Sequence, residues 1–124
     1  MTGLNQEVNW NAEMTICNML ALQAERDEIA KMESEGYKFM VGNCPMYDEC
    51  GFAIVKWNDK RSRLYKSYKQ YIKTNWDEEA GDTFDLYASS SRQELRVNVA
   101  VASVVANHLN VRFGDVVHVK HWVD

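Results

Sequence analysis

The 124-residue sequence contains little proline and cysteine and no long apolar run. Its single proline is Pro45, and neither a low-complexity tract nor an internal repeat divides the chain. No apolar run approaches the ~18 residues that a transmembrane helix needs. The first ten residues lack the basic and apolar regions of a secretory signal. We therefore expect one domain over residues 1–124, located in the cytoplasm and without membrane contact.

The three cysteines are too few and too scattered to indicate a metal site or a disulfide framework. Cys44 and Cys50 together with His118 and His121 are the one set that resembles zinc ligands. The spacing between the two cysteines is wider than in a usual zinc knuckle, and two histidines three residues apart on a strand point to opposite faces. An odd number of cysteines is typical of a protein in a reducing compartment. Cys17 is predicted to be an unreactive residue of the hydrophobic core. We expect no metal and no cofactor.

Motifs that would identify an enzyme are also missing. The sequence contains no GxSxG, P-loop, GxGxxG or HExxH pattern. A thiol site built from Cys44 or Cys50 with His118 and Asp115 remains an alternative, because such residues can converge in space without a local motif. Neighbouring carboxylates occur only in polar runs, where solvation explains them. The chain is therefore expected to be non-enzymatic, with a small Cys/His enzyme as the third hypothesis.

Charge is present in ordinary amount but is distributed in blocks. Apolar residues make up 46% of the chain and charged residues 26%, which is typical of a globular protein. The net charge is −4, yet residues 59–76 hold six basic side chains against one acidic. Residues 77–90, which follow directly, hold five acidic side chains and no basic one. A local basic patch can bind an anionic partner even in an acidic protein.

Apolar periodicity and turn residues predict the elements of the first two thirds of the chain. We expect a helix over 11–35 capped by Asn9 or Asn11 and ended by Gly36, a strand at 37–41, a loop over GNCPMYDECG, a strand at 51–57, a helix over 60–76 capped by Asn58 or Asp59, and a strand at 83–87.

The last third contains one ambiguous segment. Ser91 and Glu94 form a capping-box pattern that predicts a helix over 91–110, whereas alternating valines in 95–102 are also typical of a strand. We favour the helix, followed by strands at 111–113 and 116–123 around a Gly114-Asp115 turn. The resulting order α-β-β-α-β-α-β-β indicates a single α+β domain, with a mainly antiparallel sheet and about three packed helices.

The segment 60–76 is the strongest functional signal. On a helical wheel its apolar side chains share one arc and should face the core: Leu64, Tyr65, Tyr68, Tyr71, Ile72 and Trp76. Basic side chains occupy the opposite face: Arg63, Lys66, Lys69 and Lys73. Like charges three or four residues apart repel each other. An anionic partner would explain this face, and the alternative is a solvated surface balanced by the nearby acids Asp77, Glu78 and Glu79.

The first helix carries two apolar stripes. The wheel places one set on the core face: Trp10, Ile16, Cys17, Leu20, Ala21 and Ala24. A second, narrower stripe is a candidate for self-association or partner binding: Met14, Leu22, Ile29 and Met32. Methionine suits adaptable contacts, although the rest of the domain would also explain the stripe by covering it.

The leading hypothesis is a small interaction protein, an inhibitor or adaptor of the kind that phages and mobile elements encode. It would bind a protein or a protein–nucleic-acid complex through the basic helix face, the first helix or both, and it would form a homodimer if the second stripe self-associates. The second hypothesis is a nucleic-acid-binding protein that uses Arg63, Lys66, Lys69 and Lys73. Affinity that falls steeply with salt would distinguish the second from the first.

Overall fold

The computed structural model describes residues 8–36, 39–41, 44–46, 50–76, 83–84 and 94–123, with side chains over 8–36, 50–75 and 94–123. These residues form an α+β domain in the order α1, β1, β2, β3, α2, β4, α3 and β5. All strand pairs are antiparallel, as the sequence predicts. The predicted order differs in two places: an additional strand precedes α2, and one of the two expected C-terminal strands is helical.

Helix α1 spans Trp10–Glu35. Of its two candidate caps, Asn9 is the one used, since its side-chain oxygen accepts a hydrogen bond from the Ala12 amide at 3.1 Å. Gly36 ends the helix at φ 84°, a conformation that residues with a Cβ rarely adopt. Both boundaries confirm the prediction.

The stretch predicted as a loop contains a strand. β1 (Phe39–Val41) pairs with β2 (Cys44–Met46) in a small hairpin, with Met40 opposite Pro45. Pro45 cannot donate to a ladder, but a two-stranded hairpin leaves each strand with an outer edge where no donor is needed. Residues 37–38 of the predicted first strand lie outside the described residues.

The larger sheet has the strand order β4-β3-β5. β3 spans Gly51–Trp57, as predicted, and pairs along its whole length with β5 (Val117–Val123). β4 (Thr83–Phe84) pairs with the other edge of β3, and the rest of that predicted strand, 85–87, lies outside the described residues.

Helix α3 spans Leu95–Phe113, so the ambiguous segment 95–102 is helical. The capping-box prediction is wrong: the helix begins after Glu94, whose side chain makes no capping bond, and Ser91 lies outside the described residues. The predicted strand at 111–113 is also wrong, because these residues form the last turn of α3. Gly114, at φ 97°, ends the helix and donates its amide to the Asn110 carbonyl at 2.9 Å.

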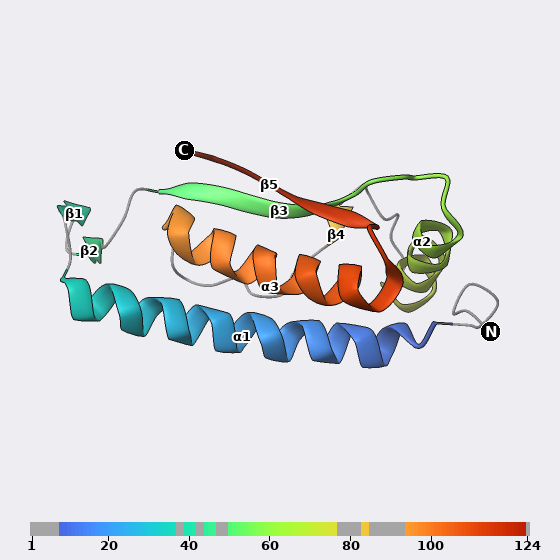
Figure 1. The fold of residues 1–124 in the computed structure, drawn as a ribbon, viewed down its shortest axis with the longest axis horizontal. Helices are drawn as coiled ribbons and strands as arrows, with labels where there is room; N and C mark the ends of the chain where they lie inside the picture. Colours follow the sequence, from blue (N-terminus) through green and yellow to red (C-terminus); the bar gives the residue numbers. More distant parts are fainter. Residues whose placement is uncertain are drawn as a thin grey trace.

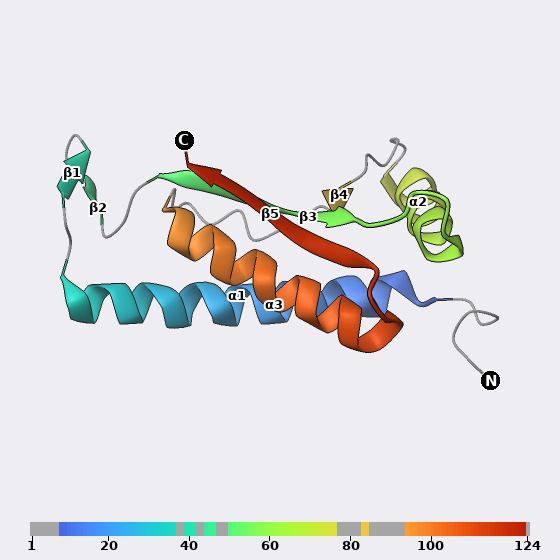
Figure 2. The same cartoon turned by 45° about the horizontal axis from the view of Figure 1, so that its top comes forward.

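The sheet, α3 and α1 form successive layers (Figures 1 and 2). α3 runs antiparallel to α1 and lies between it and the sheet, while α2 (Arg63–Trp76) packs across the end where β3 finishes. Because α3 contacts both layers, its buried residues are apolar and often small: Val97, Val101, Ala102, Val105, Ala106 and Leu109. Small side chains allow the helices to approach closely.

The rotation of α1 corrects both predicted stripes. Met14 is only 6% exposed and Met32 is fully buried, so neither belongs to an exposed stripe with Ile29 and Leu22. Conversely Ile16 and Leu20, expected in the core, are more than a third exposed. Trp10, Cys17 and Ala21 are buried as predicted. Together with Met14 they follow a three-to-four spacing, and Met32 lies about three turns further along the same face.

Within the described residues, no helix has the length and apolar character needed to cross a bilayer. Packing within the domain explains why Met14 and Met32 of the second stripe are buried. Among the four members of that stripe, Leu22 alone is strongly exposed, at 47%.

Candidate anion-binding surface

Helix α2 is held in place by its apolar face. It begins at Arg63, three residues later than predicted, because residues 60–62 form a turn in which the Asp59 side chain accepts from the Arg61 amide at 2.8 Å. The cap is Ser62 rather than the predicted Asn58 or Asp59, since its hydroxyl accepts from the Tyr65 amide at 3.1 Å.

Aromatic contacts fix the rotation of α2. Tyr68 is fully buried, and its ring centroid lies 5.2 Å from that of Trp10 and 5.4 Å from that of Trp57. Tyr65 and Ile72 are buried on the same side, while Leu64 and Tyr71 are half-buried. The Trp10 indole donates to the Ser67 hydroxyl at 2.8 Å, which ties α2 to α1. The predicted core face of α2 is thus confirmed; the side chain of Trp76 is not among those described.

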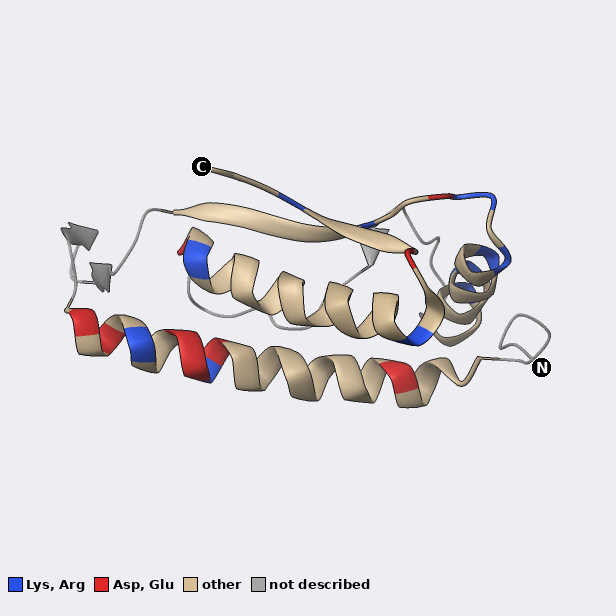
Figure 3. Cartoon of the chain, in the orientation of Figure 1, with Lys and Arg blue, Asp and Glu red and all other residues tan. Residues whose placement is uncertain are grey.

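The opposite face of α2 carries the four predicted basic residues, and all are exposed: Arg63, Lys66, Lys69 and Lys73. None of them pairs with an acidic side chain in the part of the chain that the structure describes. The acids Asp77, Glu78 and Glu79 lie outside that part. Figure 3 shows basic residues on and before α2 and, among the described residues, a group of acidic residues on the second half of α1, where basic residues also occur.

A second basic surface, which the sequence analysis missed, lies on the sheet. Strand alternation places Val55, Trp57 and Val117 against the helices, where all are buried. The alternate positions of β3 and β5 face away from α3 and include no acidic residue: Phe52, Ile54, Lys56, His118, Lys120 and Trp122. The alternation was readable in the sequence, but the register that brings the two rows together was not.

The geometry does not support the thiol site. Cys50 precedes the first residue of β3, whereas His118 pairs with Lys56 near the other end of that strand. Six residues of strand separate the two positions, roughly 20 Å. Asp115 lies at the His118 end, where its side chain accepts from the Asn58 amide group at 3.3 Å. The side chain of Cys44 is outside those described.

The histidines do not form a metal site with the cysteine that is described. β5 places His118 and His121 on opposite faces of the sheet, as the spacing predicts. Among the described residues, no group of three His, Cys, Asp or Glu side chains converges in a way that would hold a metal ion.

A buried carboxylate connects α1 to the end of α3. Glu13 is almost fully buried; Arg112 Nε donates to its Oε2 at 3.0 Å, and His108 Nε2 lies 2.9 Å from its Oε1. Burial, and secondarily the Glu13 charge, raises the pKa of the neighbouring Cys17 thiol to about 12. A thiol that stays protonated is a poor nucleophile, so Cys17 is inert core as expected.

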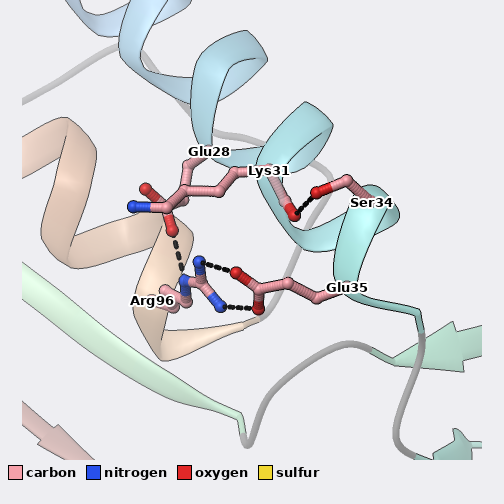
Figure 4. A network of polar contacts seen from close by, with 5 residues as sticks. All are labelled: Glu28, Lys31, Ser34, Glu35 and Arg96. Atoms are coloured by element: carbon pink, nitrogen blue, oxygen red, sulfur yellow. Dashed lines mark hydrogen bonds and ion pairs between the residues drawn. The ribbon is translucent and has the colours of Figure 1, made fainter.

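The other ends of the same two helices are joined by Arg96 (Figure 4). Its guanidinium donates to Glu28 and, through two nitrogens, to both oxygens of Glu35 at 2.7 and 3.0 Å. These hydrogen bonds raise the pKa of Arg96 further above its usual range, with Glu35 as the larger cause. Both carboxylates of α1 are thus paired with a cation of α3.

Comparison with protein-family models, with curated proteins and with solved structures finds no significant match to this chain. No relative therefore supplies an activity or a partner.

Proposed function

We propose that this chain is a non-enzymatic interaction protein that binds an anionic macromolecule through the basic face of α2. The observation that carries the proposal is the alignment of Arg63, Lys66, Lys69 and Lys73 on a helix face that is exposed and faces no acidic side chain among the described residues. Repulsion between neighbours at this spacing costs about 0.2–0.5 kcal/mol per pair, so the arrangement weakens the helix slightly. Binding of an anion would relieve that repulsion.

The rigidity of α2 supports the proposal. Buried aromatic contacts and the bond from Trp10 to Ser67 hold the helix on the domain, so the cations keep a fixed spacing before a partner arrives. A preorganised surface loses less conformational entropy on binding. An inhibitor or adaptor that covers an acidic site on another macromolecule would need such a surface, which is consistent with the expected role.

The test compares two charge reversals on the full-length chain. Lys69→Glu with Lys73→Glu alters α2, and Arg26→Glu with Lys31→Glu alters exposed cations of α1. Both variants reverse two positive charges, so their net charge is identical. On immobilised heparin, a defined polyanion, we expect the α2 variant to elute at much lower salt than wild type and the α1 variant to elute close to it. Equal elution of the two variants would show that only net charge matters and would contradict the proposal.

Purification from the native host, with and without nuclease, then separates the classes of partner. A protein that stays bound after nuclease treatment and is lost from the α2 variant supports the inhibitor or adaptor role. A complex that dissolves on nuclease treatment supports the nucleic-acid alternative.

A further inference from the structure

The open face of the three-stranded sheet has a composition unlike the rest of the surface. α3 covers one face of the sheet, and none of the described helices lies over the other (Figures 1 and 2). The side chains that project from the open face of β3 and β5 are aromatic, aliphatic or basic. Exposed apolar residues gathered on one face usually mark a binding surface.

Two exposed aromatic rings lie side by side on this face. Phe52 and Trp122 are direct cross-strand neighbours, and their ring centroids are 5.8 Å apart with an interplanar angle of 36°. Phe52 is 49% exposed and Trp122 is 43% exposed. The pair therefore packs against itself while leaving ring surface open to solvent, at a cost in exposed apolar area that a bound ligand would recover.

Positive charge runs from these rings toward α2. Lys120 is two positions from Trp122 on the same face, roughly 7 Å along the strand. At the far end of β3 the chain turns through exposed Arg61, whose Nε lies 3.7 Å from the Asp59 carboxylate, into the basic face of α2. The acidic half of α1 lies beyond α3, on the other side of the domain (Figure 3). A polyanion lying across the sheet would thus meet cations along its path.

We propose that this face binds single-stranded nucleic acid, with bases stacked on Phe52 and Trp122 and phosphates along Lys120 toward α2. The inference rests on the proposed function and names the anionic macromolecule. Stacking on aromatic side chains combined with a basic track is how single strands are bound without sequence readout. A duplex keeps its base faces covered, whereas the bases of a single strand can stack on exposed rings, so the pairing of rings with cations favours the single strand.

The experiment measures the anisotropy of a fluorescein-labelled oligothymidylate titrated with the full chain, beside a duplex of equal length. We expect the single strand to bind more tightly. Phe52→Ala and Trp122→Ala should each weaken its binding at least about tenfold without changing the salt dependence, because no ionic contact is lost. Lys66→Glu with Lys69→Glu and Lys73→Glu should weaken binding and flatten the salt dependence. Met19→Ala, which removes an exposed side chain from α1, is the matched control and should bind as wild type.

Circular dichroism and thermal melting establish that each variant is folded. Where an alanine variant is not folded, Phe52→Leu and Trp122→Leu keep apolar bulk without a flat ring and should show the same loss. Wild-type affinity in folded ring variants would overturn the inference. So would heparin retention through α2 with no oligothymidylate binding, or equal binding of single strand and duplex; both leave the proposed function standing. Absence of binding to heparin and oligonucleotide alike would overturn both.

Discussion

A helical wheel predicts the buried face of α2 correctly but that of α1 only in part. In α1, Trp10, Cys17 and Ala21 are buried as predicted, whereas Ile16 and Leu20 are exposed. In α2 the apolar and basic side chains occupy opposite faces, so only one rotation buries the apolar set. In the first half of α1 apolar side chains occur all around the helix, and several rotations bury a similar apolar area. Periodicity determines a rotation only when polar residues exclude the others.

Polar anchors select the rotation of α1. Glu13 points inward to His108 and Arg112 near one end, and Glu28 and Glu35 bond to Arg96 near the other. All of these partners lie on α3, far along the sequence. A buried carboxylate without a partner would be costly, so the rotation that satisfies these groups is favoured over rotations that bury a comparable amount of apolar surface.

The largest predicted loss of stability tests which face of α1 is buried. Met14→Glu would bury a second carboxylate beside Glu13 without a partner and should cost about 4 kcal/mol of unfolding free energy. Leu22→Glu introduces the same side chain at an exposed position of the same helix and should cost less than about 0.5 kcal/mol. Urea denaturation followed by circular dichroism measures both.

If Leu22→Glu instead unfolds the chain and Met14→Glu is tolerated, the buried face of α1 contains Leu22 and not Met14. Sedimentation of Leu22→Glu adds a second readout: if wild type is a dimer that this variant dissociates while still folded, the exposed side of α1 is a self-association surface.

The next prediction concerns Glu13, the buried carboxylate of α1 that contacts His108 and Arg112 of α3. Glu13→Ala leaves the largely buried His108 without its carboxylate and should cost about 2 kcal/mol. Arg112 is 60% exposed and can return to solvent, so it adds little. Glu33→Ala, at an exposed position of α1, is the control and should be neutral. Equal, small changes in the two melting curves would mean that Glu13 does not select the rotation of α1.

The sequence predicts local structural features better than features that depend on tertiary packing. The ends of α1, the bounds of β3 and the basic face of α2 follow from glycine, β-branched residues and periodicity, which act within a few residues. The helical state of 111–113 and the pairing of Phe52 with Trp122 depend on where α3 and β5 pack, and nothing local encodes that. The open sheet face was therefore missed although each of its strands was predicted.

Helices α1 and α2 each begin at a residue whose side chain caps the first turn. Removing either cap should lower the unfolding free energy by less than the changes described above. Asn9→Ala and Ser62→Ala each remove an acceptor from a first-turn amide and should cost about 1 kcal/mol. Asn11→Ala removes only an exposed contact with the Tyr71 hydroxyl and should cost less. Thermal melting compares the three variants. A larger loss for Asn11→Ala than for Asn9→Ala would assign the cap of α1 to the other asparagine.

The smallest predicted effect distinguishes the contribution of Lys66 to helix stability from its contribution to partner binding. Lys66→Glu converts two repulsive neighbours, Arg63 and Lys69, into attractive ones, and should raise the unfolding free energy by about 0.5 kcal/mol. Lys66→Ala removes the repulsion without adding attraction and should fall between wild type and Lys66→Glu. Retention on heparin should fall in the opposite order, with wild type strongest. Opposite signs are expected because a face adapted to a partner gives up some helix stability for affinity. If Lys66→Glu gains stability and loses no retention, the basic face is a solvated surface and the open sheet face becomes the better site for the same ligand.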